Sequence, residues 1–364
     1  MKVGVLGAGQ LARMIALAGI PLGVEFIFLD PSKDACASGL GQHLLGDYND
    51  PRLLAALAES ADVVTYEFEN VPADVAAFLA AHTQVHPAPK ALAVAQDRLV
   101  EKNFFNDLGI ATPAYQAVDS LAELEQAMVT IGWPAIIKSR TMGYDGKGQS
   151  LLKSPADLPQ AWALLAGAPA IVEAFVPFDR EVSIIAARSV SGAVVYYPLS
   201  ENQHRGGILR VSESRAGDVM QQAAEAYILR LMEALDYVGV LALELFEVKG
   251  QLIANEFAPR VHNSGHWTIE GAETSQFENH VRAILDLPLG ATTAVGKAAM
   301  VNFIGGLPDT AALLAIPHAH CHLYGKEPRK GRKVAHATLR TETSAQLHAA
   351  LAQLVTLADA VDDS

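Results

Sequence analysis

The most informative segment of this sequence is Ile136-Ile137-Lys138-Ser139-Arg140-Thr141-Met142-Gly143-Tyr144-Asp145-Gly146-Lys147-Gly148-Gln149. A short apolar run ends in Lys138, and a loop with three glycines and Lys147 leads to a new strand at Ser150. Glycines leave backbone N–H groups open to a ligand, and lysines add positive charge. The segment therefore predicts a flap between two strands that covers a polyphosphate. The alternative is a solvated hairpin turn, which would not need three glycines.

Two carboxylates stand alone in apolar strands further along the chain. Glu244 is the single carboxylate of the run 241–246 and Glu256 that of 253–257, and the pattern predicts a hairpin that joins the strands 240–248 and 252–257. A three-residue turn over 249–251 places Glu244 opposite Glu256, whereas a two-residue turn pairs Glu244 with Asn255. Burying an unpaired carboxylate is costly. In the first register the two carboxylates favour Mg²⁺ shared with substrate phosphates. The alternative is two separate salt bridges to Lys or Arg.

A second glycine-rich turn lies near the N-terminus. Residues 7–12 follow the pattern GxGxxA between an apolar strand and a helix, and Asp30 closes the next strand. This pattern is typical of dinucleotide sites, in which free N–H groups at a helix start attract phosphate. The motif alone leaves three alternatives open: a dinucleotide, another phosphorylated ligand, or a tight turn that binds nothing.

Several other polar groups are ambiguous when taken singly. Glu173 in the apolar run 171–176 is as compatible with a core strand as with a nucleotide site, and so is Glu181. Arg260 and His262 alternate, so they share a face of an extended chain. Residues 325–333 carry five cations and one anion, which indicates a monophosphate pocket or a solvated basic loop.

Three histidines alternate in a short run near the C-terminus. His318, His320 and His322 would share one strand face, whereas Cys321 would point away, and no further ligand group is near in sequence. We therefore expect a feature of an edge strand here and no zinc site.

Composition excludes several classes of protein. The 364 residues carry a net charge of −13, which argues against a bulk electrostatic grip on nucleic acid. Two cysteines cannot form a disulfide framework, and no signal peptide or membrane-spanning stretch is evident. We expect a cytoplasmic protein that acts on small molecules, with no nucleic acid and no membrane as partner.

The pattern of apolar runs predicts an α/β and α+β chain. The first third alternates short strands with helices, which favours a parallel sheet. The middle carries strands joined by short turns, which favours antiparallel pairing, and the C-terminal part ends in an amphipathic helix over 344–360. The segment 91–108 is helical in pattern.

The ordered set of strand-end lysine, glycine flap, Glu-bearing strand and two carboxylates resembles the ATP-grasp fold. More narrowly, the sequence is similar to the 5-(carboxyamino)imidazole ribonucleotide synthases of purine biosynthesis. The stretches that carry this resemblance are 7–14, 64–72, 143–149, 255–268 and 331–333. The resemblance implies a Rossmann-like domain over 1–98, a lid domain over 99–190 and a metal- and ATP-binding domain with an antiparallel sheet over 191–364.

The resemblance also implies a role for individual residues. Those expected to bind ATP are Arg98, Lys138, Gly143, Tyr144, Asp145, Gly146, Lys147, Gly148, Gln149, Glu173, Ala174, Phe175, Val176, Glu181, His204, Asn255 and Glu256. Glu244 and Glu256 would hold Mg²⁺. Tyr144, Asp145, Arg260 and His262 would be catalytic, and Gln10, Leu11, Asn263, Lys326 and Arg332 would bind the ribonucleotide. Met142, Ala8 and Ala12 stand where the family has glycine.

The implied reaction uses ATP and bicarbonate to carboxylate the exocyclic amine of 5-aminoimidazole ribonucleotide. Carboxyphosphate would be the intermediate, and a homodimer the expected assembly. Three alternatives remain at this point: a formate-using ATP-grasp transformylase, an NAD-dependent oxidoreductase built on residues 7–12 and Asp30, and a catalytically dead nucleotide-binding regulator.

Overall fold

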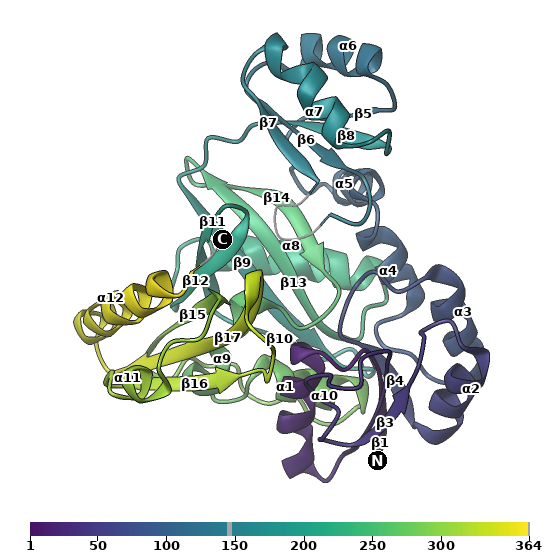
Figure 1. Cartoon of the computed structure of the whole chain (residues 1–364), viewed down its shortest axis with the longest axis vertical. Coiled ribbons are helices and arrows are strands. Elements are labelled where there is room, and N and C mark those ends of the chain that lie inside the picture. The colour runs from purple at the N-terminus through teal and green to yellow at the C-terminus, as the bar shows by residue number, and fades with distance from the viewer. Residues whose placement is uncertain (144–147, 363–364) are drawn as a thin grey trace.

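A computed structural model of the chain describes residues 1–143 and 148–362, in which three sheets are packed with helices (Figure 1). The N-terminal sheet is parallel, in the order β3-β2-β1-β4. Its strands are β1 (Lys2–Leu6), β2 (Glu25–Asp30), β3 (Gln42–Leu45) and β4 (Val63–Tyr66), and its helices are α1 (Gln10–Gly19), α2 (Pro51–Ser60) and α3 (Ala73–His82). β1 and β2 are buried along nearly their whole length, as strands covered by helices on both faces must be.

The lid sheet lies at the opposite end of the molecule from the N-terminal sheet (Figure 1). It is antiparallel, in the order β5-β8-β6-β7. Its elements are β5 (Tyr115–Val118), β6 (Ala135–Ser139), β7 (Gln149–Leu152) and β8 (Ala170–Ala174), with helices α6 (Leu121–Ile131) and α7 (Leu158–Leu164). Apolar residues of both helices form one core with β6 and β8. The lid sheet therefore has a hydrophobic core of its own.

The large sheet between them is antiparallel, in the order β14-β13-β9-β11-β12-β15-β17-β16, with β10 on β9. Its strands are β9 (Arg180–Arg188), β10 (Val194–Tyr196), β11 (Leu199–Arg205), β12 (Ile208–Arg215), β13 (Gly239–Val248), β14 (Gln251–Ala258), β15 (Lys297–Gly305), β16 (Ala319–Leu323) and β17 (Arg329–Thr341). Its helices are α8 (Gln221–Ala234), α9 (Thr268–Gly271), α10 (Gln276–Ile284), α11 (Thr310–Leu314) and α12 (Ser344–Ala360). β9 lies inside the range expected for the lid, but it pairs in this sheet.

The helical pattern expected over 91–108 is confirmed, but the segment forms two helices. α4 (Pro89–Ala95) ends before Gln96, and α5 (Arg98–Asp107) begins after Asp97. The Asp97 carboxylate accepts hydrogen bonds from the backbone N–H groups of Leu99 and Val100, which is the usual way to start a helix. This break places α5 beside β14.

The N-terminal sheet is joined to the large sheet through a buried histidine. Val240 N donates to His280 Nδ1 at 3.1 Å, so His280 Nε2 carries the proton and donates to Thr65 Oγ1 at 2.9 Å. Burial lowers the pKa of His280 to about 3. The neutral imidazole therefore bridges β4 and β13.

The predicted parallel N-terminal sheet and antiparallel large sheet are confirmed, and α12 has the expected bounds. The β11–β12 hairpin and α10 were not predicted. Among the described residues, no helix is long and apolar enough to cross a membrane.

Candidate active site

The β13–β14 hairpin places Glu244 directly opposite Glu256. Of the two alternative turns, the structure has the two-residue one, because Val248 pairs with Gln251. The register then shifts between Glu244 and Leu245, since Leu245 pairs with Ala254 and Asn255 is left as an extra residue. Such a bulge moves the following side chains to the other face of the strand. The bulge at Asn255, and not the turn, brings the two carboxylates together.

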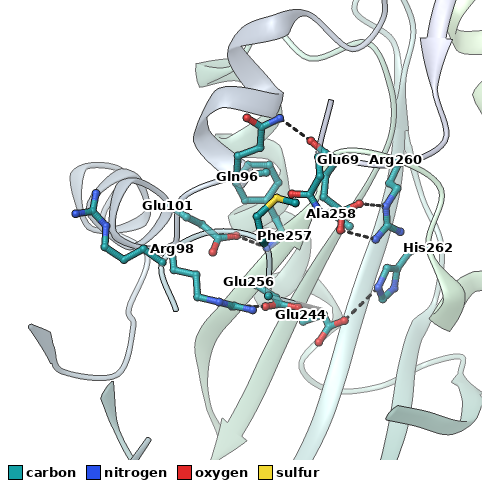
Figure 2. Close-up of a pocket in the computed structure, with 15 residues that line it drawn as sticks. Glu69, Gln96, Arg98, Glu101, Glu244, Glu256, Phe257, Ala258, Arg260 and His262 are labelled. Carbon is teal, nitrogen blue, oxygen red and sulfur yellow. Dashed lines mark hydrogen bonds and ion pairs between the residues drawn. The ribbon is translucent and has the colours of Figure 1, made fainter. Parts of the chain in front are cut away.

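Each carboxylate has one basic neighbour (Figure 2). Arg98 NH1 lies 2.6 Å from Glu256 Oε2, and His262 Nε2 lies 3.1 Å from Glu244 Oε1. Burial raises the pKa of Glu256, but Arg98 outweighs burial and the pKa falls to about 2. Glu256 is therefore ionised at neutral pH. Only Glu256 forms the salt bridge to Lys or Arg that the alternative interpretation requires among the described residues, because Glu244 contacts a histidine instead. The two carboxylates nevertheless lie opposite each other.

A cavity of about 570 Å³ runs along these carboxylates. Its walls come from the lid sheet, the large sheet, the start of α1 and the segment that follows β4. The predicted residues among them are Gln10, Leu11, Arg98, Lys138, Gly143, Gln149, Glu181, His204, Glu244, Asn255, Glu256, Arg260, His262 and Asn263. Asn255 Oδ1 and both polar side-chain atoms of Asn263 are buried without a hydrogen-bond partner. Because such atoms are costly to bury unpaired, they favour a polar ligand in this cavity.

Lys138 and Glu173 form a buried ion pair beside the cavity. Lys138 Nζ lies 3.1 Å from Glu173 Oε2, and the fully buried Lys102 lies 3.4 Å from the same oxygen. The two lysines hold the pKa of Glu173 at about 2, against burial, which raises it. Lys138 lines the cavity, whereas Glu173 turns inward. Ala174, Phe175 and Val176 do not line the cavity either; Phe178 does, stacked on Phe246 with centroids 5.0 Å apart.

The described part of the flap is anchored to the start of α5. Ser139 N donates to Gly148 O at 2.8 Å, and Arg98 N donates to Arg140 O at 2.9 Å. Arg140 also forms two hydrogen bonds with the Asp97 carboxylate, at 3.1 and 2.6 Å. Met142 has a φ of +62°, a conformation that glycine adopts more easily. Tyr144, Asp145, Gly146 and Lys147 lie outside the described residues.

The N-terminal glycine turn is filled by a side chain of the protein itself. Glu67, which follows β4, accepts hydrogen bonds from Gly9 N and from Ala12 N, the latter at 3.0 Å. A Cβ on Gly7 or Gly9 would come within 2.5–2.6 Å of Glu67 atoms, so both glycines are needed for this approach. Asp30 accepts from Ala8 N at 2.9 Å. The N–H groups that would hold a dinucleotide phosphate are therefore already used.

Further polar side chains surround the cavity. Arg260 donates two hydrogen bonds to Glu69, one of them at 3.0 Å, and it outweighs burial to lower the pKa of Glu69. His204 is bonded to Glu181; burial lowers the pKa of His204, but this bond and nearby carboxylates raise it overall. The Arg260–Glu69 pair therefore keeps ionised groups at the cavity wall.

The basic run near the C-terminus contributes only part of its charge to the cavity. Lys326 Nζ donates to Gln10 Oε1, and Lys333 lines the cavity wall, whereas Lys326 and Arg332 do not line it. Two of the three alternating histidines, His320 and His322, lie on β16, which is an edge strand as expected. His318 precedes the strand with a φ of +69°, so it does not share their strand face. His322 bonds Glu270 at 3.0 Å. Within the described residues, no group of three or more His, Cys, Asp or Glu side chains is arranged to hold a metal.

The contributors to this site that sequence reasoning missed include Glu67, Glu69, Lys102 and Asn202, and also Phe178 and Phe246. The first two lie in the stretch 64–72, which was noticed as a whole but given no role. Asn202 and the predicted His204 lie on β11, whose polar sequence gave no strand signal. Lys102 looked like an ordinary polar residue of a helix.

Comparison with known proteins supports one family over the whole chain. The ribonucleotide synthetase preATP-grasp domain matches residues 1–96, the ATP-grasp domain matches 103–277, and the phosphoribosylaminoimidazole carboxylase C-terminal domain matches 298–350. N5-carboxyaminoimidazole ribonucleotide synthase of Pseudomonas aeruginosa is 54% identical over 99% of this chain and 100% of its own length. The Bacillus subtilis synthase is 38% identical over 92% and 90%.

Solved structures agree with this result. The N5-carboxyaminoimidazole ribonucleotide synthetase of Thermus thermophilus has a TM-score of 0.93 and 52% identity, and the match covers 98% of each chain. The Aspergillus clavatus N5-carboxyaminoimidazole synthase in complex with ADP and 5-aminoimidazole ribonucleotide has a TM-score of 0.92 and 30% identity over 99% of each chain. This chain therefore belongs to the N5-carboxyaminoimidazole ribonucleotide synthase family of ATP-grasp enzymes.

Proposed function

We propose that this chain uses ATP and bicarbonate to carboxylate the exocyclic amine of 5-aminoimidazole ribonucleotide, with release of ADP and phosphate. The observation that carries the proposal is the opposed pair Glu244 and Glu256 in the wall of a 570 Å³ cavity that Lys138 also lines. Acidic and basic groups are thus available for a metal and for phosphates in one cleft, in a chain of the synthase family.

ATP is proposed to lie between the lid sheet and the large sheet. Lys138 and the 143–149 flap would meet its phosphates, while Phe178 and Phe246 would pack near its base. Asn255 offers an unpaired amide oxygen to the same ligand. The remaining residues proposed to contact ATP are Arg98, the segment 174–176, Glu181, His204 and Glu256. Glu173, which is buried against Lys102 and Lys138, is proposed to act through these lysines and not by touching ATP.

The residues present fit a magnesium ion. Two opposed carboxylates and the orphaned Asn255 Oδ1 supply hard oxygen donors. Mg²⁺ binds through one or two carboxylates plus substrate phosphates, so a full protein cage is not required. We propose Glu244 and Glu256 as its ligands. Bound there with ATP, the ion would offset negative charge on the phosphates.

The proposed reaction has two steps. A bicarbonate oxygen attacks the γ-phosphorus, the bond to the bridging oxygen of ADP breaks, and carboxyphosphate forms. The amine nitrogen then attacks the carboxyl carbon, phosphate leaves and the nitrogen loses a proton. Lys138 stabilises charge on the phosphates, and the flap excludes water from the labile intermediate. We propose Asp145 for proton handling beside Tyr144, Arg260 and His262.

The ribonucleotide is proposed to occupy the end of the cavity near α1. Gln10 and Leu11 begin that helix and line the cavity, and Lys326 contacts Gln10. Asn263 has two unpaired polar atoms there, and the charge of Lys326, Arg332 and Lys333 suits a monophosphate. On family grounds we also propose domains over 1–98, 99–190 and 191–364, a homodimer and a cytoplasmic location.

The deciding experiment measures ADP release by the purified chain. ADP should form when aminoimidazole ribonucleotide and bicarbonate are both present, and the product should carry the label of ¹⁴C-bicarbonate. Release that requires formate in place of bicarbonate would overturn the proposal in favour of a transformylase. An NAD-dependent reaction is disfavoured because Glu67 and Asp30 occupy the N–H groups of the glycine turn.

A further inference from the structure

One face of α5 holds the backbone around the Asn255 bulge. Arg98, Glu101 and Lys102 are spaced i, i+3 and i+4, so they share that face. Arg98 meets the Glu256 carboxylate, while Glu101 Oε1 accepts from Phe257 N at 2.7 Å (Figure 2). Lys102 Nζ donates to Asn255 O at 2.7 Å and lies 3.5 Å from Ala254 O. The three side chains therefore contact four consecutive residues, 254–257.

β14 needs these contacts because it is the outermost strand of the large sheet. An edge strand with a bulge leaves backbone groups outside the ladder, and buried groups of that kind require partners. Ala254 N is satisfied by Ala111 O at 2.7 Å, and α5 supplies the next groups along the strand. Without Lys102, the Asn255 carbonyl would lose its charged donor at the point where the register shifts.

The same ammonium group reaches the lid sheet. Lys102 and Lys138 both contact Glu173 Oε2, at 3.4 and 3.1 Å. Two ammonium groups thus share one carboxylate, which leaves a net positive charge on the three groups. Of the two lysines, Lys138 is the one that lines the cavity and can present this charge to a ligand. Lys102 itself is fully buried and does not line the cavity, so it acts through its neighbours.

We propose that Lys102 is a positioning residue with two effects. It fixes the Asn255 bulge, which sets Glu256 opposite Glu244, and it compensates Glu173, which leaves the charge of Lys138 available to a nucleotide phosphate. The inference rests on the proposed function in assigning Mg²⁺ and ATP to this cavity. It assigns a role to a residue that touches neither ligand.

The first test compares Lys102→Met with Lys90→Met. Lys90 also donates to a backbone carbonyl, that of Ala234 at 2.8 Å, but on the exposed side of α4. Calorimetry with ADP, with and without Mg²⁺, gives a readout that is independent of turnover. For Lys102→Met we expect ADP affinity with Mg²⁺ to fall about tenfold and the half-saturating Mg²⁺ concentration to rise about fivefold. The KM for the ribonucleotide should stay within about twofold, as should every value for Lys90→Met.

The double variant Lys102→Met/Glu173→Gln separates the two effects. Metal-free ADP affinity should recover to within about threefold of wild type, because Lys138 no longer faces an uncompensated carboxylate. The half-saturating Mg²⁺ concentration should stay raised, because the bulge still lacks its donor. A purely structural role would not produce this split.

Wild-type metal and nucleotide affinities in a folded Lys102→Met chain would overturn the inference. If the single variant does not fold, the double variant replaces it, because it removes both buried charges. A wild-type Mg²⁺ dependence of the double variant would also overturn the inference. A wild-type chain that binds ADP with Mg²⁺ but does not turn over would reject the proposed function alone.

Discussion

Glu244 lies opposite Glu256 only because Asn255 is bulged out of the β14 ladder. The two-residue turn at the end of the hairpin would otherwise set Glu244 against Asn255 and send Glu256 to the other face. The geometry of the site is therefore decided in the middle of the strand, where α5 contacts it.

Neutralising one member of this pair should abolish turnover while the fold persists. Glu256→Gln keeps the size of the side chain but removes the charge that Arg98 and the proposed magnesium ion both need, and we expect kcat to fall at least about 100-fold. Steady-state assays over a range of Mg²⁺ concentrations measure the effect. Glu59→Gln, an exposed change on α2, is the control. A kcat within about threefold of wild type would remove Glu256 from the metal site.

Glu67→Gln should destabilise the N-terminal glycine turn. The carboxylate accepts from both Gly9 N and Ala12 N, whereas an amide can turn only one oxygen toward them. Leaving one buried N–H unpaired costs about 1–3 kcal/mol of unfolding free energy. Denaturant unfolding measures the loss against Glu59→Gln. Equal stability of the two variants would show that the turn does not depend on this anion.

Because of Glu101, the free energy of unfolding should decrease as the pH rises. Burial, followed by the charge of Glu256, raises the pKa of Glu101 to about 8, so the folded chain keeps a proton that the unfolded chain releases near 4.5. The stability gained from the protonated form is full below about pH 4.5 and is lost as pH rises to about 8, by up to about 1.4 kcal/mol per unit. Glu101→Gln should remain folded and flatten this slope. Parallel slopes for the variant and wild type between about pH 5 and 8 would contradict the assignment.

Because of His280, the free energy of unfolding should decrease as the pH falls. Because burial lowers the pKa of His280 to about 3, its contribution is full above about pH 6.5 and is lost as pH falls from there. His280→Gln should cost stability at neutral pH, since it breaks the bridge between Thr65 and Val240, and should make the acid limb less steep. Urea midpoints at about pH 7 and pH 5 test both statements, with exposed His348→Gln as control. An unchanged acid slope would exclude His280 as its source.

Local pattern predicted the elements that are buried and periodic. The buried parallel strands β1, β2 and β4, the apolar β13 and β14 and the C-terminal helix were identified because their patterns are strong. The partly exposed edge strand β3 was not predicted. β11 escaped notice because its residues alternate toward a polar cavity, where Asn202 and His204 are needed. The break at Asp97 was missed because the carboxylate both begins α5 and pairs with Arg140, and the second role is invisible in sequence.

The convergence of Glu244 and Glu256 was predicted correctly, but for the wrong reason. A turn length can be guessed from neighbouring residues, whereas a bulge stabilised by Lys102 depends on a residue 153 positions away. The filled glycine turn is a similar case, because Glu67 meets Gly9 only after β4 has paired with β1. Contacts of this kind follow from tertiary structure and leave no local signature.

The dependence of β14 on α5 limits how the chain can be divided. A fragment that starts after residue 110 would contain both carboxylates and all of the large sheet. It would nevertheless expose a bare strand edge, which recruits other chains and leads to aggregation. Recombinant halves, circular permutants and biosensor insertions should therefore keep residues 97–107 physically joined to, or co-expressed with, the hairpin that they cover.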